Sequence, residues 1–572
     1  MLSRTKGRTD LTMTDAEPGP LSGNRAAMPK RLHAAARVLA QLLLVYLLLL
    51  AVHAFLGRWT PEYLHGRDLW HFWFSRMVVP VVMLGVFFSV ARLIPAGVML
   101  ASAFLFVGTL SSIKRDSTGE PFQVSDLFLA GQSMHLMHYV HWYHWLLGLT
   151  VIPAAIYFFW NLRFRWWSLP LALLCIVLLS TYRIERVANW IHDNAWWIGM
   201  ENLTFSQAES ERMNGLGTHL YFSTAGLRLK TYTESEVAKA LDALNAPPSP
   251  PAMAAQGPAP DIYLILGEAW WRDPDDKASP LDQLKAAGFT ESQAISPVYG
   301  GTTPNSEFEV LTGIPIKSFH DGIIPYQHYI QYISDASRSL PRLLSEQGYI
   351  TTAYHNFTRR FWLRDQVYPK LGFGRFMSMD EMTLTIQPND WPTDEGLYRA
   401  VLDNSAGNNP RFDFIVTVET HGPYEKHEAD PEGHGGVHDY RTRLSSAARS
   451  LAAFKAQLDQ RGRPYVLVLF GDHLPGLRLH QWKNGMKKET DPRLHQVPVL
   501  IASNIRDASV FAKDIANRPL YCMTPLLLAW VGETFSDRYL NHLSAICRNP
   551  EGPVPMPAEA VIQNQLFSAK PL

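Results

Sequence analysis

Long apolar runs alternate with polar segments in the first third of the chain. The runs occupy positions 38–56, 69–90, 94–110, 145–160 and 167–182. A helix needs about 20 mostly apolar residues to cross the hydrocarbon core of a bilayer, and each run reaches or approaches that length. The last two runs are the shortest, and tryptophans flank them as they do at membrane interfaces. The pattern therefore predicts an α-helical membrane domain of about five spans.

Lysines and arginines near the ends of these runs predict how the domain is oriented. With the N-terminus in the cytoplasm, seven of them lie inside and six outside, or ten and six when the whole N-terminal tail is counted. Cytoplasmic segments carry the excess of basic residues, so this orientation is favoured. An odd number of spans then places everything after residue 182 outside the cytoplasm. A long polar tail precedes the first run, which is long enough to remain as an anchor, so we expect no cleavable signal peptide.

Two polar features lie within this region. In the segment HLMHYVHWYHW, histidines recur every third residue, at His135, His138, His141 and His144. That spacing places them along one side of a helix, where a metal site is conceivable, but no carboxylate or cysteine accompanies them. We interpret the segment instead as an amphipathic helix at the membrane interface. We expect Arg76, in the second run, to extend its guanidinium to the outer interface.

A different pattern begins after a Pro- and Ala-rich stretch at 245–261, which is typical of a semi-rigid spacer. Beyond it, short β-branched runs alternate with helical stretches, namely IYLILGE, YITTAYH, FDFIVTVET, YVLVLFGD and VPVLIAS. Such runs indicate buried strands of a mainly parallel sheet flanked by helices. The sequence thus predicts an extracytoplasmic α/β domain at 261–572, preceded by a cytoplasmic tail (1–36), a membrane domain (37–183) and a connector (184–260).

Composition narrows the functional classes. The 572 residues carry 52 basic and 52 acidic side chains, so no net positive charge favours binding to nucleic acid. Of the three cysteines, Cys175 falls in the fifth apolar run, while Cys522 and Cys547 fall outside the membrane. These two could pair as a disulfide, although two thiols in one domain are also often merely buried.

Acidic and imidazole side chains follow three of the predicted strands. Glu268 ends the first strand, Glu419 and His421 follow the third, and Asp472 and His473 end the fourth. Ligands of open α/β sheets bind beyond the carboxyl ends of the strands. A single residue of this kind usually caps the next helix, but several at one edge predict a site for a metal ion or a phosphate.

The stretch SPVYGGTTPNSEFEVLTG, at 296–313, places two glycines and two threonines before a predicted helix. Thr303 has a structural explanation, because Thr is a good N-cap and Pro is favoured at the first helical position. The chemical explanation is that a hydroxyl at a helix N-terminus can attack a phosphate that the backbone amides hold. A threonine hydroxyl is a weak nucleophile, so this chemistry requires a divalent ion such as Mn²⁺, Mg²⁺ or Zn²⁺. On physical grounds alone, Thr302 is the rival nucleophile.

Taken together, the motifs resemble a known family. LILGEAWWRDP, GGTTPNSEFEVLTG, YHNFTRRFWLRDQVYPKLGF, VTVETHGPY and LFGDHLP occur in the order and approximate spacing of the lipoteichoic acid synthase-like phosphoglycerol transferases, within the alkaline phosphatase and sulfatase superfamily. The resemblance covers essentially the whole chain. It implies five N-terminal spans followed by an extracytoplasmic catalytic domain with an alkaline phosphatase/sulfatase-like α/β fold.

The resemblance also implies roles for individual residues. It implies that Thr303 is the nucleophile, because this threonine stands four residues before Glu307. It implies one ion of the Mn²⁺ type, with Mg²⁺ or Zn²⁺ as alternatives, held by Glu268, Thr303, Asp472 and His473. It places four residues in the pocket for the lipid headgroup: His355, Trp362, Arg364 and His421. The family usually has an aspartate where this chain has Phe357.

The function that the resemblance implies is transfer of glycerol phosphate from phosphatidylglycerol to an acceptor in the cell envelope, through a phosphothreonine-type intermediate. The acceptor would be a glycan, a polymer or another lipid, and the enzyme would lie in the bacterial cytoplasmic (inner) membrane with its catalytic domain in the periplasm. Two alternatives stay open. One is a phosphoethanolamine transferase that uses phosphatidylethanolamine, and the other is a catalytically inactive membrane interaction protein with the same fold.

Overall fold

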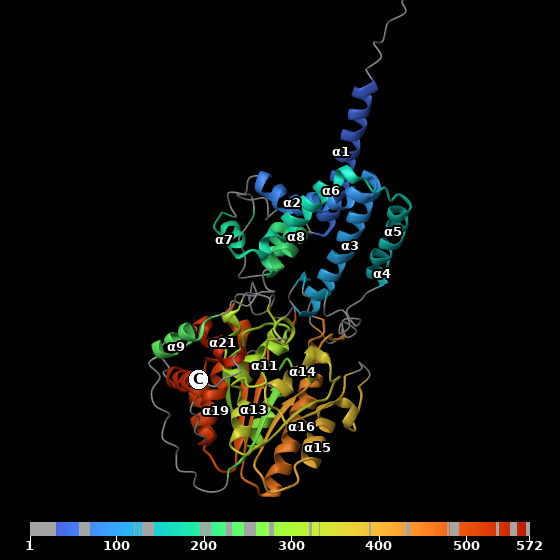
Figure 1. Cartoon of the computed structure of the whole chain (residues 1–572). Helices are drawn as coiled ribbons and strands as arrows, with labels where there is room; N and C mark the ends of the chain where they lie inside the picture. Colours follow the sequence, from blue (N-terminus) through green and yellow to red (C-terminus); the bar gives the residue numbers. More distant parts are fainter. Residues whose placement is uncertain are drawn as a thin grey trace, which may run out of the picture.

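The chain folds into a helical N-terminal part and an α/β domain, which lie at opposite ends of the molecule (Figure 1). The computed structural model describes residues 30–56, 69–118, 121–124, 126–127, 142–194, 200, 207–224, 232–244, 259–273, 279–319, 323–330, 332–387, 391–425, 427–428, 430, 435–477, 480, 491–532, 537–548 and 557–567. Most of the predicted tail, most of the Pro/Ala-rich spacer, and His135, His138 and His141 of the histidine run lie outside these residues.

Helices occupy all five of the predicted apolar runs. They are α1 (Lys30–Leu56), α2 (Leu69–Val90), α3 (Leu93–Thr118), α4 (Trp142–Leu149), α5 (Val151–Trp160) and α6 (Leu169–Ser180). The run at 145–160 is divided between α4 and α5, and His144, the described member of the histidine run, is buried on α4. By length and composition, two segments of the described residues are long and apolar enough to cross a membrane, Ala35–Leu56 and Leu93–Arg115. The other apolar segments of this part that pass the composition test are shorter, namely Phe74–Val90, His144–Trp160 and Trp166–Ser180.

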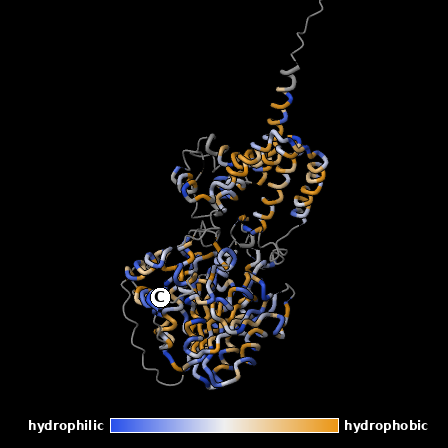
Figure 2. Tube along the Cα trace, viewed as in Figure 1, coloured by the Kyte–Doolittle hydropathy of each residue, from blue (hydrophilic) through white to orange (hydrophobic). Residues whose placement is uncertain are grey.

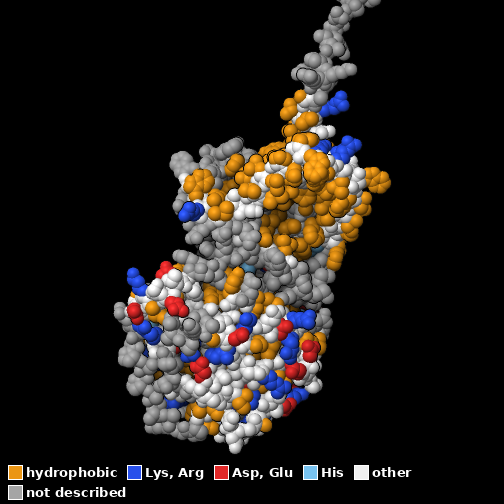
Figure 3. Space-filling model, in the orientation of Figure 1, with side chains coloured by type: hydrophobic (Ala, Val, Ile, Leu, Met, Phe, Trp, Pro, Cys, Tyr) orange, Lys and Arg blue, Asp and Glu red, His pale blue; other side chains and the backbone are white. Residues whose placement is uncertain are grey.

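The N-terminal helices leave large apolar side chains on their surface. Ile156 on α5 and Val177 on α6 are 60% and 58% exposed, and Trp160 is 87% exposed. Figure 2 shows that hydrophobic residues dominate these helices, and Figure 3 shows their side chains gathered over the outer surface of this part, whereas the visible face of the α/β domain carries mixed charges. A soluble monomer rarely exposes so large an apolar area, so this surface suits contact with lipid.

The connector contributes to both parts of the molecule. Helix α8 (Gln207–Ser223) packs on α2 and α3, whereas α9 (Glu234–Ala243) packs on the C-terminal helix α21 (Glu559–Phe567). The connector between the two parts is therefore shorter than the sequence indicates. Helix α7 (Glu185–Asn194) lies between α6 and α8 in the sequence.

The prediction for Arg76 is wrong. Its side chain is 8% exposed, and its guanidinium donates hydrogen bonds of 2.7 and 2.8 Å to the backbone oxygens of Arg212 and Met213 on α8. Helix α8 is kinked immediately afterwards, at Gly215 with φ +78°. A kink frees backbone carbonyls, and a buried cation satisfies them. Arg76 therefore stabilises a broken helix instead of reaching the interface.

The α/β domain is built on one mostly parallel sheet of eight strands in the order β4-β3-β5-β1-β6-β7-β2-β8. The strands are β1 (Asp261–Gly267), β2 (Thr290–Ile295), β3 (Ile350–His355), β4 (Arg375–Met377), β5 (Arg411–Val416), β6 (Tyr465–Gly471), β7 (Gln496–Ser503) and β8 (Arg518–Pro519). All five predicted strands are present, and the central ones are completely buried. Strand β7 runs antiparallel to both of its neighbours, and the short strands β2, β4 and β8 were not predicted.

Helices pack around the sheet and complete one hydrophobic core. They are α10 (Asp282–Ala286), α11 (Thr303–Thr312), α12 (Pro325–His328), α13 (Leu340–Glu346), α14 (Arg364–Lys370), α15 (Asp394–Asp403), α16 (Val437–Arg461), α18 (Ala508–Ile515), α19 (Met523–Val531) and α20 (Arg538–Cys547), besides α9 and α21. Helices α11 and α14 lie in the half of the domain that faces the N-terminal helices (Figure 1).

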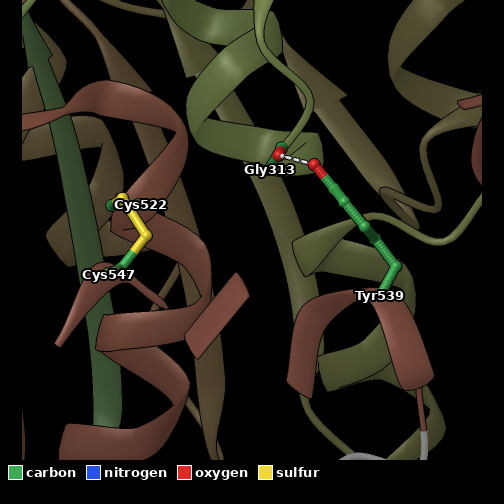
Figure 4. The surroundings of a disulfide bond; sticks show 4 residues. All are labelled: Gly313, Cys522, Tyr539 and Cys547. Atoms are coloured by element: carbon green, nitrogen blue, oxygen red, sulfur yellow. Dashed lines mark hydrogen bonds between the residues drawn. A yellow bond between two sulfur atoms is a disulfide. The ribbon is translucent and has the colours of Figure 1, made fainter. Parts of the chain in front are cut away.

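A disulfide fixes the C-terminal helices beneath α11. Cys522, at the start of α19, is bonded to Cys547, at the end of α20, and both are fully buried. Figure 4 shows this bond beside Tyr539, whose hydroxyl donates a 2.7 Å hydrogen bond to the backbone oxygen of Gly313 at the end of α11. The structure therefore pairs the two cysteines that the sequence left open, and it leaves Cys175 as a buried free thiol.

Candidate active site

The sheet itself brings together the residues that follow two of its strands. Strands β1 and β6 are parallel neighbours, and Gly267 is paired in register with Gly471. The next residues along the chain are Glu268 and Asp472, so both carboxylates emerge at the same edge. His473 follows directly. Side-chain atoms of Glu268, Asp472 and His473 that can bind a metal lie within 4.8 Å of one another, and all three residues are buried.

The hydrogen bonds of His473 indicate how its ring is oriented. Its Nδ1 lies 2.9 Å from the backbone oxygen of Leu474, which can only accept, so Nδ1 carries the proton. Nε2 then presents a lone pair, 3.3 Å from an oxygen of Asp472 and 3.6 Å from an oxygen of Glu268. Three electron-rich atoms facing one another are repulsive unless a cation lies between them. A backbone carbonyl that orients the distal nitrogen is the usual second shell of a metal-binding histidine.

The carboxylate of Asp472 has one oxygen held and one available. Its Oδ1 accepts hydrogen bonds of 2.8 Å from the backbone N–H groups of Ala269 and His473. Its Oδ2 is buried and accepts no hydrogen bond from the described residues. An orphaned buried carboxylate oxygen is costly unless it binds a metal or a proton. The donor set of two carboxylates and one imidazole therefore fits a divalent ion, without selecting among Mn²⁺, Mg²⁺ and Zn²⁺.

Burial, and then the charge of Asp472, raise the pKa of Glu268 well above its usual value. Uncompensated negative charge of this kind attracts either a proton or a cation. The main chain of Glu268 is fixed by two threonines, since its N–H donates to Thr417 Oγ1 and its carbonyl accepts from Thr420.

Thr303 is the first residue of α11, and its hydroxyl donates a 3.2 Å hydrogen bond to Oε2 of Glu268. It is therefore directed at the cluster of possible ligands. Thr302 precedes the helix in the left-handed conformation, at φ +64°, and makes no side-chain capping hydrogen bond. Ser306, one turn into the helix, donates a 2.7 Å hydrogen bond to the backbone oxygen of Asp472 and so holds α11 against the end of β6.

The predicted pocket residues His355 and Arg364 belong to one buried network. Nε and Nη2 of Arg364 donate to Glu307, a residue of α11, the first over 2.9 Å, while Nη1 lies 3.2 Å from Nε2 of His355. Nδ1 of His355 donates to the backbone oxygen of Val416 over 3.0 Å. Burial, and then the charge of Arg364, hold the pKa of His355 well below its usual value, so the ring is neutral. Arg364 thus connects α11 with the end of β3.

The two remaining predicted residues, His421 and Trp362, belong to a cluster of aromatic side chains. The ring of His421 lies 4.4 Å from that of Trp391, which lies 5.1 Å from Phe357. The Phe361 ring is 5.3 Å from both Phe357 and Trp362. Nδ1 of His421 is 2.6 Å from the backbone oxygen of Gly422, so Nε2 is the nitrogen that can meet a ligand. Where the family usually has a carboxylate, this chain therefore places a ring within an aromatic cluster.

Strained backbone is concentrated beside these residues. The described non-glycine residues with positive φ are Ala269, Thr302, Trp362, Leu363 and Asn517. Ala269, Thr302 and Leu363 directly adjoin Glu268, Thr303 and Arg364, respectively. Trp362 is itself a predicted pocket residue, and Asn517 lies elsewhere. Such conformations cost about 1–3 kcal/mol each and are typical of functional sites.

Several residues of this site were not predicted from the sequence. In the sequence, Glu307 serves only to locate Thr303 within its motif. Trp391 lies in a stretch that matches none of the motifs. The hydroxyl of Tyr368 donates to Glu307 over 3.0 Å, although the motif that contains Tyr368 predicts no role for it. One signal could have indicated the partner of Glu307: an acidic residue on the buried face of a predicted helix usually has a buried cationic partner.

Comparisons with known proteins identify a family domain and several relatives. Residues 260–532 match the Sulfatase family. A putative cyclic β-1,2-glucan modification protein of Rhizobium meliloti is 28% identical over 473 residues, which cover 76% of this chain and 73% of that protein. A lipoteichoic acid synthase of Staphylococcus saprophyticus is 27% identical over 190 residues, 30% of this chain and 28% of that protein.

Among solved structures, a Streptococcus pyogenes phosphoglycerol transferase in complex with sn-glycerol-1-phosphate is similar, with a TM-score of 0.44 and 20% identity, over 57% of this chain and 87% of that chain. The sulfatase match and the lipoteichoic acid synthase relatives lead to the same assignment as the motifs. The chain is a lipoteichoic acid synthase-like protein of the alkaline phosphatase and sulfatase superfamily.

Proposed function

We propose that the protein is a membrane-anchored phosphotransferase that moves glycerol phosphate from phosphatidylglycerol to a glucan of the cell envelope. The observation that supports this most directly is the 3.2 Å hydrogen bond from Thr303 to Glu268, within the cluster that Glu268 forms with Asp472 and His473. It places a hydroxyl beside a set of ligands for a divalent ion. Such an ion, when bound, lowers the pKa of the hydroxyl and offsets the charge of the phosphate.

The reaction proceeds by two displacements at phosphorus. Oγ of Thr303 attacks the phosphodiester, and its proton leaves by way of Oε2 of Glu268, which already accepts its hydrogen bond. The bond from phosphorus to the diacylglycerol oxygen breaks, and Nε2 of His421 gives that oxygen its proton. A hydroxyl of the acceptor then attacks, its proton passes to His421, and the bond from phosphorus to Thr303 breaks. The hydroxyl of Thr303 is restored with the proton from Glu268.

The buried network positions the parts of this reaction. Arg364 joins α11, which carries Thr303, to His355 at the end of β3. Both ring nitrogens of His355 and the guanidinium of Arg364 already have partners in this network, so we propose that the two residues hold α11 and the end of β3 in place around the headgroup. The N-terminus of α11 adds its backbone amides and its dipole to this end of the site.

Three observations support a proposal for the location of the domain. Two N-terminal helices are long and apolar enough to cross a bilayer, and the shorter helices expose apolar side chains that suit lipid. The disulfide between Cys522 and Cys547 suits an oxidising compartment outside the cytoplasm. We therefore propose a five-span domain with the N-terminus in the cytoplasm and the catalytic domain on the periplasmic side, where it stays close to lipid headgroups.

The glucan acceptor is proposed from the Rhizobium meliloti relative, which aligns with most of this chain and is described as a putative cyclic β-1,2-glucan modification protein. A second donor is favoured by one observation. The Trp391 ring contacts those of His421 and Phe357, and aromatic rings attract an ammonium group, so phosphatidylethanolamine is the competing donor.

The test uses purified full-length protein in detergent with Mn²⁺ and either phosphatidylglycerol or phosphatidylethanolamine. Diacylglycerol release from phosphatidylglycerol alone, with transfer of glycerol phosphate to added cyclic β-1,2-glucan, is the expected result. Release only from phosphatidylethanolamine would replace the proposed donor. Release from neither lipid would remove the proposed activity and favour the non-catalytic alternative.

A further inference from the structure

A second pair of buried carboxylates lies apart from the possible metal ligands already described, next in the sequence to residues predicted to line the headgroup pocket. Asp394 begins α15, and Glu419 lies in the segment after β5; both side chains are fully buried. The backbone N–H of Asp394 donates to Glu419 Oε2 over 2.8 Å, and Nδ2 of Asn356 donates to Asp394 Oδ1 over 3.0 Å. Three segments that are distant in the sequence therefore meet around two carboxyl groups.

The polar atoms at this point are mostly unpartnered. Asp394 Oδ2 and Glu419 Oε1 have no hydrogen-bond partner among the described residues, and neither do Asn356 Oδ1 and the hydroxyl of Tyr398. All four residues are at most 2% exposed. The amide of Asn356 already lies against the carboxylate of Asp394, and Tyr398 follows Asp394 by one helical turn. Orphaned buried oxygens are rare in folded proteins, because each costs about 1–3 kcal/mol or more.

The surrounding charges do not neutralise the pair. Burial, and then the charge of Glu419, raise the pKa of Asp394 well above its usual value, and burial also raises the pKa of Glu419 despite Ser446, Arg449 and Arg443 nearby. Arg443 is already bonded to Asp439 and to the backbone oxygens of His421 and Pro423. When both carboxyl groups are ionised, a positive partner is needed to balance the charge of Asp394 and Glu419.

We propose that Asp394, Glu419 and Asn356 form a second cation site, which binds a hard divalent ion of the Ca²⁺ or Mg²⁺ class. Carboxylate oxygens and an amide oxygen are ligands that such ions prefer, and the bound ion balances the charges of the two carboxylates. None of these proposed ligands is an imidazole or a thiol, which distinguishes this site from the one that contains His473. The inference does not depend on the reaction proposed above.

The site braces the headgroup pocket. Asn356 adjoins His355 and Phe357 in the chain, and Glu419 lies two residues before His421. Trp391, which contacts both His421 and Phe357, lies three residues before Asp394. A cation that binds the three segments at once fixes the spacing between the two sides of the pocket. Its role is positional, because its ligands are fully buried and adjoin the predicted pocket residues in the sequence.

The test counts metal ions in a variant whose other site is disabled. Full-length Glu268→Gln/Asp472→Asn protein is dialysed against Ca²⁺, Mg²⁺ or Mn²⁺, freed of unbound metal, and analysed by mass spectrometry for metal content. The proposal predicts one retained divalent ion per chain and a melting temperature that falls when EDTA removes it. Absence of a retained ion with all three metals would overturn the proposal and indicate that the two carboxyl groups share a proton.

Further variants locate the ion. In this background, we predict that adding Glu419→Gln abolishes retention of the ion, and that adding Asp394→Asn separately does the same. If the first variant does not fold, the second tests the proposal. Asp413→Asn serves as the matched control, because Asp413 is an equally buried carboxylate that already pairs with Arg411, so the ion should be retained. An ion that survives both substitutions at the pair would place the site elsewhere and contradict the proposal.

Discussion

Arg364 and Glu307 form an ion pair whose side chains are 1% and 0% exposed. Tyr368 and His355 occupy further hydrogen-bonding positions on the two partners, so the pair is part of a satisfied network. It links the helix that begins at Thr303 with the strand that ends at His355. The pair should therefore affect both the stability of the domain and the placement of Thr303.

Removing one partner of this pair should be strongly destabilising. Glu307→Gln leaves the Arg364 guanidinium buried without a counter-charge, which costs about 3–5 kcal/mol. The exposed pair of Arg399 and Glu395 offers a control, because Glu395→Gln should cost less than about 0.5 kcal/mol. Urea unfolding followed by tryptophan fluorescence measures both. Equal costs for the two variants would contradict the assignment.

The disulfide should contribute measurably to stability. It closes a loop with a sequence separation of 25, for which loss of the cross-link costs about 3 kcal/mol. We expect the double variant Cys522→Ala/Cys547→Ala to unfold at a lower temperature than the wild type, and reduction of the wild type to have a similar effect. Cys175→Ala is the control, because it removes the free thiol and leaves the disulfide intact. Reductant should lower its unfolding temperature as much as that of the wild type. A double variant as stable as the wild type would show that the bond is dispensable.

Glu309 should make the stability of the domain depend on pH. Its side chain is 2% exposed, and burial raises its pKa to about 8, although the backbone N–H of Ile316 donates to it. The folded state therefore holds the proton more tightly than the unfolded chain, whose glutamate has a pKa of about 4.3. The stabilisation is complete below about pH 4 and is lost as the pH rises to about 8.

Glu309→Gln tests this dependence, since a glutamine retains an acceptor but does not titrate. Across that pH range, the free energy of unfolding of the wild type should fall relative to the variant, by on the order of a few kcal/mol. Urea unfolding at a series of pH values measures the difference. Parallel curves for the two proteins would show that the pKa of Glu309 is not raised in the folded state.

Phe357→Leu distinguishes the two candidate donors. With phosphatidylglycerol the ring supplies only packing, so we expect kcat/KM to fall by no more than about fivefold, which corresponds to about 1 kcal/mol. With an ammonium headgroup the loss of the aromatic face should lower kcat/KM further, because cation–π contacts contribute up to about 2 kcal/mol when desolvated. A larger fall for phosphatidylethanolamine, together with turnover of that lipid, would favour the second donor.

The sequence predicted the core of the catalytic domain well, for a physical reason. Strands β1, β5 and β6 are buried on both faces, so their apolar runs are continuous, and the polar residues that follow them mark the functional edge. The short strands β4 and β8 carry no such run. The antiparallel direction of β7 depends on its connection to β6, which hydrophobic pattern does not encode.

The same limit applies to the site. Glu268, Asp472 and His473 could be predicted because each follows a recognisable strand. The partners of Arg364 could not, because Glu307 lies 57 positions away and is joined to it only by the tertiary fold. Arg76 illustrates the converse, since a charge in an apolar run does not reveal that a kinked helix supplies its carbonyl partners.

The central claim is that Thr303, and not Thr302, carries the transferred group. The most direct measurement is peptide mass spectrometry of the full-length protein after brief incubation with phosphatidylglycerol and Mn²⁺ and rapid acid quenching. We predict a mass increase of one glycerol phosphate, less water, on Thr303, and its absence in Thr303→Ala protein. Modification of Thr302, or release of diacylglycerol while both threonines stay unmodified, would contradict the account.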